Sequence, residues 1–272
     1  MKIKILLVVS LIGLGIWWWV NRPNNNFKMV FCDVGQGDAA LVVYGNFQML
    51  IDAGPENRKV LNCLEDNLPF GDKQLELAVI THWDLDHAGG IRDVLNYYKI
   101  EKVFSGTKPE AGFEQINYTG NLKSGDVIKY GLMSFEILST EGVEGKGEDE
   151  DNANSVVGVL SYKDYVFFMM GDAPLVVEQR LVWRQIVEKS QSLKASKSEN
   201  LKVVLKVSHH GSDTATGEEL LEAVKPNMAV VSVGKNNFGH PAEEVIKRLN
   251  ERGIQILRTD MMGEIEFVIS NQ

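Results

Sequence analysis

The sequence predicts a mixed α/β domain, on the basis of three observations. Short apolar runs rich in β-branched residues, such as Leu77–Ile80, recur along the chain and are typical of buried strands. Segments with helical spacing of their apolar residues, such as Ile91–Tyr98, alternate with these runs. All five histidines follow predicted strands, and none lies within an apolar face. Strands and helices therefore build the core, and a polar site is expected where strands end.

Composition limits the class of protein. The chain has 272 residues, enough for a full core as one large domain or as two fused halves. Its 44% hydrophobic and 24% charged residues are those of a globular protein. The net charge of -9 weighs against a protein that coats nucleic acid through bulk positive charge. It does not exclude a site whose positive charge is supplied by bound cations.

Residues 1–26 differ in composition from the rest of the chain. Two lysines, Lys2 and Lys4, precede an apolar run at residues 5–20 that contains three consecutive tryptophans. A membrane span needs about 20 residues, and interfacial tryptophans extend a shorter run. Because tryptophans match a signal-peptide cleavage site poorly, an uncleaved anchor is favoured over a cleaved signal peptide. The N-terminal lysines then predict that residues 27–272 form a domain outside the cytoplasm, membrane-anchored or, in the alternative, secreted after cleavage.

The first part of the domain reads as strands joined by tight turns. Gly45-Asn46 is typical of a hairpin turn. The expected elements are strands at Met29–Cys32, Ala39–Tyr44, Phe47–Ile51 and Leu77–Ile80, with a helix at Val60–Leu68. The two cysteines, Cys32 and Cys63, each lie in an apolar run and fit no metal or disulfide framework, which favours two buried thiols over a bridge.

The rest of the chain repeats the alternation of strands and helices. Alternating apolar residues predict a hairpin at Val156–Tyr162 and Tyr165–Met170. A helix followed by a polar connection is expected over residues 175–200. The other expected strands are Lys102–Phe104, Asp126–Tyr130, Phe135–Leu138, Leu201–Val207, Met228–Val233, Ile254–Arg258 and Glu264–Ile269, and the other helices are Ile91–Tyr98, Glu218–Val224 and Ala242–Asn250.

The segment Thr81–Gly90 concentrates the strongest chemical signal. Four candidate metal ligands fall within six residues, between a predicted strand and a helix: His82, Asp84, Asp86 and His87. In such a turn, alternate side chains can converge on one point. Two imidazoles and two carboxylates suit zinc, manganese or iron.

Two more carboxylates lie at strand ends. Asp52 follows the strand Phe47–Ile51, where it can orient a ligand in the next loop or cap the backbone. Asp172 follows the strand Tyr165–Met170 and is a candidate ligand that bridges two metals.

A basic segment runs from Arg180 to Lys206, with seven basic residues against two acids. An ordinary charged helix face is the favoured interpretation, and a strip that binds a polyanion is the alternative.

Five motifs in this order resemble the metallo-β-lactamase superfamily and, within it, the hydrolase domain of the ComEC family of DNA-uptake competence proteins. The resemblance covers about residues 27–270. It is carried by Asp33-Val34-Gly35-Gln36-Gly37-Asp38-Ala39, Thr81-His82-Trp83-Asp84-Leu85-Asp86-His87-Ala88-Gly89-Gly90, Gly171-Asp172-Ala173, Ser208-His209-His210-Gly211-Ser212 and Gly239-His240-Pro241. It implies a four-layer αβ/βα sandwich, two sheets face to face with helices outside, preceded here by the N-terminal anchor.

The resemblance also implies a site that holds one or two divalent metal ions. The ligands implied for one metal are His82, Asp84 and Asp172, and those for the other are Asp86, His87, Asp172 and His240. Asp86 would orient a metal-bound hydroxide, while His209 or His210 would contact a phosphate or donate a proton. Supporting positions behind the ligands are expected at Asp38, Asp52 and Asn154.

Two departures from the superfamily pattern affect the first metal. Asp84 stands where the usual second histidine of the central motif lies, as in the competence-type branch. The usual third histidine falls near Asn154 and Ser155, neither of which is a strong ligand. The site is therefore rich in oxygen, which favours manganese over zinc, or partial occupancy.

The implied function is metal-dependent phosphodiester hydrolysis, with DNA as the leading substrate. The chain has one candidate span, so a membrane channel for DNA uptake would be a separate partner. One alternative is a cell-surface esterase for small phosphodiesters such as phosphocholine-like esters, which the acidic balance favours. Another alternative is a non-catalytic metal-binding module, which the weak third ligand position favours. The oligomeric state is left open.

Overall fold

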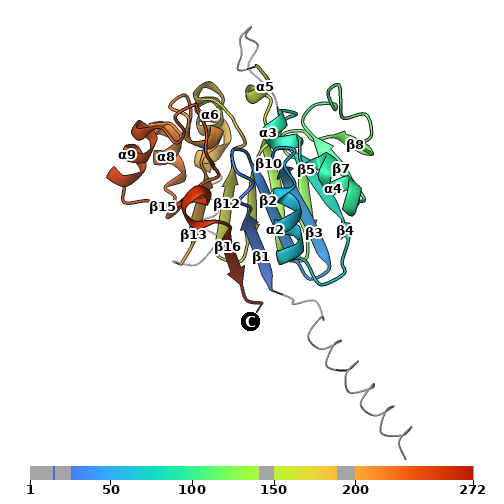
Figure 1. Ribbon diagram of the computed structural model, residues 1–272. Coiled ribbons are helices and arrows are strands. Elements are labelled where there is room, and N and C mark those ends of the chain that lie inside the picture. The colour runs from blue at the N-terminus through green and yellow to red at the C-terminus, as the bar shows by residue number, and fades with distance from the viewer. Residues whose placement is uncertain (1–14, 16–25, 141–149, 189–199, 272) are drawn as a thin grey trace, which may run out of the picture.

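Two seven-stranded sheets lie face to face, and helices cover their outer faces (Figure 1). The computed structural model describes residues 26–140, 150–188 and 200–271, together with Gly15. The strands are β1 (Phe27–Phe31), β2 (Ala39–Tyr44), β3 (Phe47–Ala53), β4 (Gln74–Leu75), β5 (Leu77–Ile80), β6 (Lys99–Ile100), β7 (Val103–Ser105), β8 (Tyr118–Asn121), β9 (Val127–Tyr130), β10 (Met133–Ser139), β11 (Val157–Tyr162), β12 (Tyr165–Met169), β13 (Lys202–Lys206), β14 (Met228–Val231), β15 (Gln255–Arg258) and β16 (Ile265–Ile269). The helices are α2 (Lys59–Asn67), α3 (Leu85–Ala88), α4 (Ile91–Tyr97), α5 (Glu150–Ala153), α6 (Leu175–Leu181), η1 (Val182–Ile186), η2 (Ser208–Gly211), α8 (Glu218–Val224), α9 (Glu243–Glu251) and α10 (Thr259–Met262).

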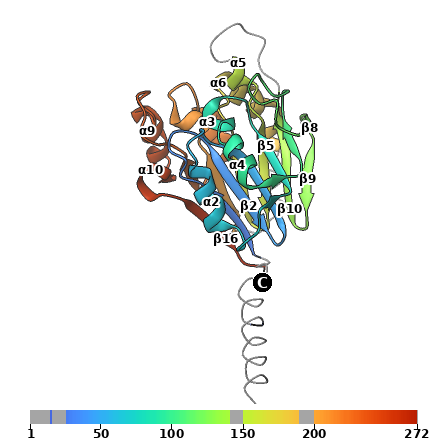
Figure 2. The same ribbon diagram turned by 45° about the vertical axis from the view of Figure 1, so that its right-hand side comes forward.

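Each sheet combines antiparallel hairpins with parallel crossovers. The first sheet has the order β16-β1-β2-β3-β5-β7-β8 and is antiparallel from β16 to β3, then parallel. The second has the order β15-β14-β13-β12-β11-β10-β9 and is antiparallel from β9 to β12, then parallel. Parallel strands need crossover connections, and the helices in these connections cover the outer faces. The last strand, β16, returns to the first sheet beside β1, as Figure 2 also shows.

Three layers of apolar side chains fill the spaces between the sheets and the helices. The central layer, between the two sheets, includes Phe27, Met49, Phe135 and Phe167. A second layer lies between the first sheet and helices α2 and α4, and a third lies between the second sheet and helices α6, α8 and α9. The expected four-layer sandwich is therefore confirmed.

Most predicted elements are present with small shifts in their bounds. Helix α2, for example, spans Lys59–Asn67 instead of Val60–Leu68. The sequence did not predict the short elements β4, β6, β8 and α3, because two to four residues carry too little periodicity to be recognised. In the segment 175–200, α6 continues into the π-helical turn η1, and residues 189–199 lie outside the described part of the chain.

The predicted anchor at residues 5–20 also lies outside the described residues, apart from Gly15. Among the residues that are described, no helix has the length and apolar character required to cross a bilayer. The anchor and the location of residues 27–272 outside the cytoplasm stay predictions.

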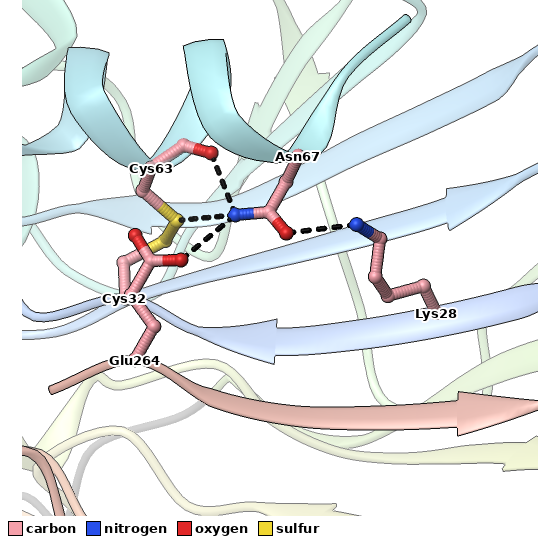
Figure 3. Close-up of a disulfide and its surroundings, with 5 residues drawn as sticks. All are labelled: Lys28, Cys32, Cys63, Asn67 and Glu264. Atoms are coloured by element: carbon pink, nitrogen blue, oxygen red, sulfur yellow. Dashed lines mark hydrogen bonds between the residues drawn. A yellow bond between two sulfur atoms is a disulfide. The ribbon is translucent and has the colours of Figure 1, made fainter. Parts of the chain in front are cut away.

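Cys32 and Cys63 form a disulfide, so the prediction of two buried free thiols was wrong (Figure 3). Cys32 follows β1, and Cys63 lies on the face of α2 that packs against the first sheet. This packing brings the two Cα atoms to 5.8 Å, a normal separation for a disulfide. The bridge could not be predicted from the sequence, because the two cysteines are 31 residues apart and each lies among apolar neighbours.

Asn67 links the disulfide to β1 and to Glu264, which directly precedes β16 (Figure 3). Its side-chain nitrogen donates to the carbonyl oxygen of Cys63 at 2.9 Å and to Glu264 Oε2 at 2.8 Å. Its side-chain oxygen accepts a hydrogen bond from Lys28 Nζ at 2.8 Å. Because Cys32 directly precedes the loop that leads to Asp38, this cross-link fixes the start of that loop.

Replacing both cysteines by alanine (Cys32→Ala with Cys63→Ala) is expected to lower the free energy of unfolding by about 2–4 kcal/mol, because the bridge restricts the unfolded chain. Urea unfolding monitored by circular dichroism measures this difference. Dithiothreitol should destabilise the parent protein by a similar amount and leave the double variant unchanged. Equal unfolding midpoints for the parent and the variant under oxidising conditions would contradict this expectation.

Candidate metal centre

The loops that carry the predicted site residues meet at one edge of the two sheets. The first sheet supplies Asp38 after β1, Asp52 at the end of β3, and the segment 82–87 after β5. The second sheet supplies Asp172 after β12, His209 and His210 after β13, and His240 after β14. The carboxyl ends of strands from both sheets thus face one another, which is the usual place for a ligand site in an open α/β sheet.

Backbone hydrogen bonds join three of these loops. The amide of Asp38 donates to the carbonyl of Asp86 at 3.0 Å, and the amide of Gly54 donates to the carbonyl of Asp38 at 2.7 Å. The amide of Gly90 then donates to the carbonyl of Gly54 at 2.7 Å. Gly37 is required at this junction, because a Cβ there would collide with the carbonyl oxygen of Asp86 and its φ is +139°.

Asp52 orients His87 from behind. The carboxylate of Asp52 accepts hydrogen bonds from the amide and the hydroxyl of Thr81, both at 2.7 Å. It also lies 2.9 Å from His87 Nδ1. With a proton on Nδ1, the lone pair of His87 Nε2 points away from Asp52 and is free to bind a metal. Asp52 thus lies behind His87, and its predicted role in supporting a metal ligand stays a prediction.

His82, His87 and Asp172 form the first group of donor atoms. Their ligand atoms lie within 4.8 Å of one another, and all three side chains are buried. His87 Nε2 is 3.2 Å from Asp172 Oδ1. Asp84 lies beside this group, with its Oδ2 atom 3.5 Å from His82 Nε2 and its side chain 42% exposed.

Ser155 lies where a third histidine was expected, and its hydroxyl contacts Asp172 and His82. Its hydroxyl accepts a hydrogen bond from the amide of Asp172 at 3.2 Å and lies 3.4 Å from His82 Nδ1. Asn154 is half-buried between α5 and Ser155. The protein thus offers oxygen atoms, not a third imidazole, on this side of the centre.

A second group of donor atoms centres on His210. His210 Nε2 is 3.2 Å from Asp86 Oδ2 and 3.5 Å from Asp172 Oδ2. Its Nδ1 atom donates to the carbonyl oxygen of Ser232 at 2.9 Å. This bond leaves the lone pair of Nε2 facing the carboxylates. His210 is buried and lies within 4.8 Å of Asp86 and His87.

His240 and His209 lie towards the rim. His240, the histidine implied for the second metal, is absent from the donor groups found among the described residues. His209 is 22% exposed, and its Nε2 atom is 3.8 Å from Asp172 Oδ2. The geometry therefore favours His210 over His240 as a ligand and places His209 and His240 outside the two donor groups.

Lys206 is an interior residue that the sequence did not associate with the site. Its side chain is 2% exposed, and its Nζ atom is 2.5 Å from Asp38 Oδ2. It also donates to the carbonyl of Val207 at 2.8 Å. Asp38 in turn lies 3.4 Å from His210 Nδ1. Lys206 therefore does not contribute to a basic surface strip, contrary to that alternative, and its charge offsets the buried carboxylate of Asp38.

The loop with His209 and His210 is held in an uncommon backbone conformation. Both residues have left-handed φ angles, of 50° and 52°. Glu178, which the sequence did not associate with the site, accepts hydrogen bonds from the amides of Thr216 at 2.7 Å and Gly217 at 2.8 Å. Burial raises the pKa of Glu178 to about 7. Only folding places this carboxylate beneath the loop, because Glu178 lies in an ordinary helical pattern.

The carboxylates and imidazoles shift one another's pKa values strongly. Burial lowers the pKa of His210, but the carboxylates of Asp172 and Asp38 outweigh it and raise that pKa to about 10. Asp172 and Asp52 likewise outweigh burial and raise the pKa of His87 well above its usual value. Burial raises the pKa of Asp172, but His87 and His210 hold it well below its usual value. The buried carboxylates therefore stabilise positive charge in this pocket, whether it is carried by the imidazoles or by a bound cation.

The residues present fit divalent cations. Four buried donor atoms make no hydrogen bond and contact only one another or the carboxylates of Asp84, Asp86 and Asp172, namely His82 Nε2, His87 Nε2, Asp172 Oδ1 and His210 Nε2. Buried polar atoms are rarely left unpaired, and a cation would satisfy all four. Imidazole and carboxylate donors are those of zinc, manganese and iron centres.

A sequence model of the metallo-β-lactamase superfamily matches residues 32–235. The chain belongs to this superfamily. It is a mixed α/β domain of this hydrolase superfamily, and the donor groups described above could hold divalent metals.

Competence proteins are among the relatives of this superfamily member. ComE operon protein 3 of Bacillus subtilis (strain 168) is 30% identical over 268 residues, which cover 88% of this chain and 33% of that protein. Competence protein ComA of Neisseria gonorrhoeae is 30% identical over 249 residues, which cover 90% of this chain and 33% of that protein. The chain thus spans about a third of the length of these curated relatives. The expected resemblance to competence proteins is confirmed.

A solved structure shows the same fold. The metallo-β-lactamase fold protein YhfI from Bacillus subtilis matches with a TM-score of 0.57 and 9% identity, over 89% of this chain and 99% of that one. At this level of identity the likeness supports the fold alone.

His210→Ala is expected to lower metal affinity more than His240→Ala does. Loss of a partner that only supports a ligand costs about 10- to 100-fold in affinity, so loss of His210 as a ligand should cost at least about 100-fold. We expect a loss below about 10-fold for His240→Ala. Competition with a chromophoric chelator measures both affinities, and circular dichroism checks that each variant is folded. The reverse order would support the ligand set implied by the sequence motifs.

Metal binding is expected to release protons and to strengthen as pH rises. The raised pKa values mean that His87 and His210 carry extra protons at pH 7 in the metal-free protein, whereas a ligand imidazole must be neutral. Isothermal titration calorimetry at pH 7 in buffers of different ionisation enthalpy should show about one to two protons released per ion. An affinity that does not change between about pH 6 and 8 would contradict the predicted protonation.

Proposed function

We propose that this chain is a metal-dependent phosphodiesterase that cleaves DNA in a competence-type uptake system. The observation that supports this most directly is the overlap of the donor groups. Asp172 is shared by the group with His82 and His87 and by the group with Asp38 and His210. Its two oxygens face different histidines, since Oδ1 is 3.2 Å from His87 Nε2 and Oδ2 is 3.5 Å from His210 Nε2. Two cations held side by side by shared ligands can act on both oxygens of a phosphodiester displacement.

The chain's own residues have separate tasks in this proposal. When bound, the cations would polarise a phosphoryl oxygen and lower the pKa of an attacking water. Asp86, 38% exposed, can accept a hydrogen bond from that water and orient it. His209 faces the open side of the centre, where it can donate a proton to the leaving oxygen or a hydrogen bond to a phosphoryl oxygen. Asp52 and Ser155 hold His87, His82 and Asp172 in place for this chemistry.

Manganese is the proposed metal, with zinc as the alternative. Asp84 and Ser155 present oxygen atoms beside His82, where a nitrogen-rich zinc site would carry two further imidazoles. Oxygen donors favour manganese over zinc, and they also favour partial occupancy of this side.

We propose DNA as the substrate because the chain is related to competence proteins. The proposed location outside the cytoplasm is supported by the disulfide. A disulfide persists in an oxidising compartment and is rare in the cytosol, so the bridge between Cys32 and Cys63 supports a domain outside the cytoplasm. We include in the proposal membrane attachment through residues 5–20 and a separate membrane channel as partner.

One observation favours a second candidate, an esterase for small phosphodiesters. Lys206, counted in the basic segment, is buried against Asp38, and the chain has a net charge of -9. A small ester needs fewer phosphate contacts than a DNA strand does, so it depends less on a basic surface.

The test uses the full chain, stripped with chelator and reconstituted with manganese or zinc. We expect metal-restored cleavage of both bis-p-nitrophenyl phosphate and labelled single-stranded DNA. Asp172→Ala should lower kcat/KM at least about 100-fold, because this carboxylate faces both donor groups. Glu219→Ala, an exposed substitution on α8, is the control and should match the parent.

Cleavage of the small ester alone would favour the second candidate. Tight metal binding without cleavage of either substrate would reject both enzymes in favour of a non-catalytic metal-binding module.

A further inference from the structure

An exposed aromatic side chain lies on the loop that carries His240. Phe238 is 75% exposed. Its ring and that of His240 are 5.8 Å apart and nearly parallel, with an interplanar angle of 29°. The outer face of Phe238 is therefore presented to solvent at the rim of the metal centre.

Asn236 makes this loop rigid. Its side-chain oxygen accepts hydrogen bonds from the amides of Phe238 and Gly239, both at 3.0 Å, and of His240 at 3.1 Å. Its side-chain nitrogen donates to the carbonyls of Gly234 at 2.9 Å and His240 at 2.8 Å. One side chain thus organises the whole turn. The exposed ring is held in position before any ligand arrives, which lowers the entropic cost of binding to it.

A row of rings connects Phe238 with the metal ligands. The ring of His240 is 5.6 Å from that of His209, which is 6.3 Å from that of His210. The ring of His210 is 5.2 Å from that of His87. Burial increases along this row. Phe238 is exposed, His240 and His209 are partly buried, and His210 and His87 are buried. A substrate with its phosphate at His209 would therefore have its adjoining group over His240 and Phe238.

Bulk positive charge does not favour the binding of a nucleic acid strand to this protein. The chain is acidic, with a net charge of -9, and Lys206 is in the interior. Proteins that hold single strands combine phosphate contacts with bases stacked on aromatic side chains, and the stacking contribution does not depend on positive charge. An exposed, prearranged ring next to a phosphodiester site suits this role.

We propose that Phe238 is a stacking platform for the nucleobase next to the phosphodiester bound at the metal centre. The substrate class it selects is single-stranded nucleic acid, because the faces of a base within a duplex are already covered by the neighbouring base pairs. This proposal rests on the proposed phosphodiesterase function and deepens it. Phe238 sets specificity and does not take part in the chemical step.

The test compares two substrates of equal length and charge, an oligothymidylate and its abasic counterpart, with the metal-loaded full chain. The measured quantity is the ratio of kcat/KM for the oligothymidylate to kcat/KM for the abasic strand. Phe238→Ala should lower this ratio at least fivefold, the lower end of what base stacking contributes. Phe238→Trp should preserve it. Phe238→Leu keeps an apolar side chain without a π face and should lower it as alanine does.

Phe70→Ala is the matched control. Phe70 is 83% exposed and lies between α2 and β4. It is near the start of β5, whereas the metal centre lies beyond the end of that strand. This variant should leave the ratio unchanged. An unchanged ratio in Phe238→Ala, or an equal loss in Phe70→Ala, would overturn the proposal.

A binding measurement separates this inference from the proposed function. Fluorescence anisotropy gives the Kd of labelled oligothymidylate and of the abasic strand without any cleavage. If the parent binds oligothymidylate more tightly, and Phe238→Ala removes that difference, the stacking site stands even when no phosphodiester is hydrolysed. If the parent cleaves DNA but binds both strands equally, the phosphodiesterase stands and the stacking site is rejected.

Discussion

The mutual repulsion of buried carboxylates is the constraint on which the site depends. Asp38, Asp52 and Asp172 are all buried at one edge of the sandwich. Carboxylates in a low-dielectric interior require nearby positive charge or hydrogen-bond donors. Asp38 has Lys206, Asp52 has Thr81 and His87, and Asp172 faces His87 and His210. The charge that still faces the centre is what a divalent cation would neutralise.

The two sheets divide this task. The first sheet supplies Asp52 and the histidines of the central motif, whose loops are joined through backbone hydrogen bonds at Asp38, Gly54 and Gly90. The second sheet supplies Asp172 and His210, whose loop is supported by Glu178. Because neither sheet carries a complete donor set, the centre exists only while the sandwich is assembled. The phenylalanines and methionines between the sheets therefore also preserve the metal site.

Polarity decreases from the centre to the rim. His87 and His210 have one nitrogen fixed by a hydrogen-bond acceptor behind the ring, so the other nitrogen faces the donors. His209 and His240 lie further out, and Phe238 ends the row. Such a gradient suits a substrate with an anionic reacting group attached to a flat apolar one. A nucleotide has this character, and so does an aryl phosphodiester.

The part of the candidate site that lies within one short segment could be predicted from the sequence. The turn from His82 to His87 is confined between a strand and a helix, so its side chains had to converge wherever the rest of the chain lay. The position of Asp172 and His210 after apolar strands was equally visible, because loops after strands in such folds gather at one edge. The four-layer arrangement followed from the order of the motifs and their family resemblance.

Other features depended on contacts between distant segments. The disulfide joins residues 31 positions apart, and the buried pair of Lys206 with Asp38 joins the two sheets. No local pattern distinguishes a lysine that points inward from one that continues a basic strip. The sequence also could not decide whether His210 or His240 joins the donor groups, because both histidines follow strands and both lie in conspicuous motifs. The sequence by itself determined which segments carry candidate ligands, because that depends on short-range periodicity. Only the tertiary structure decided which charged side chains pair with one another, because that depends on how the two sheets pack.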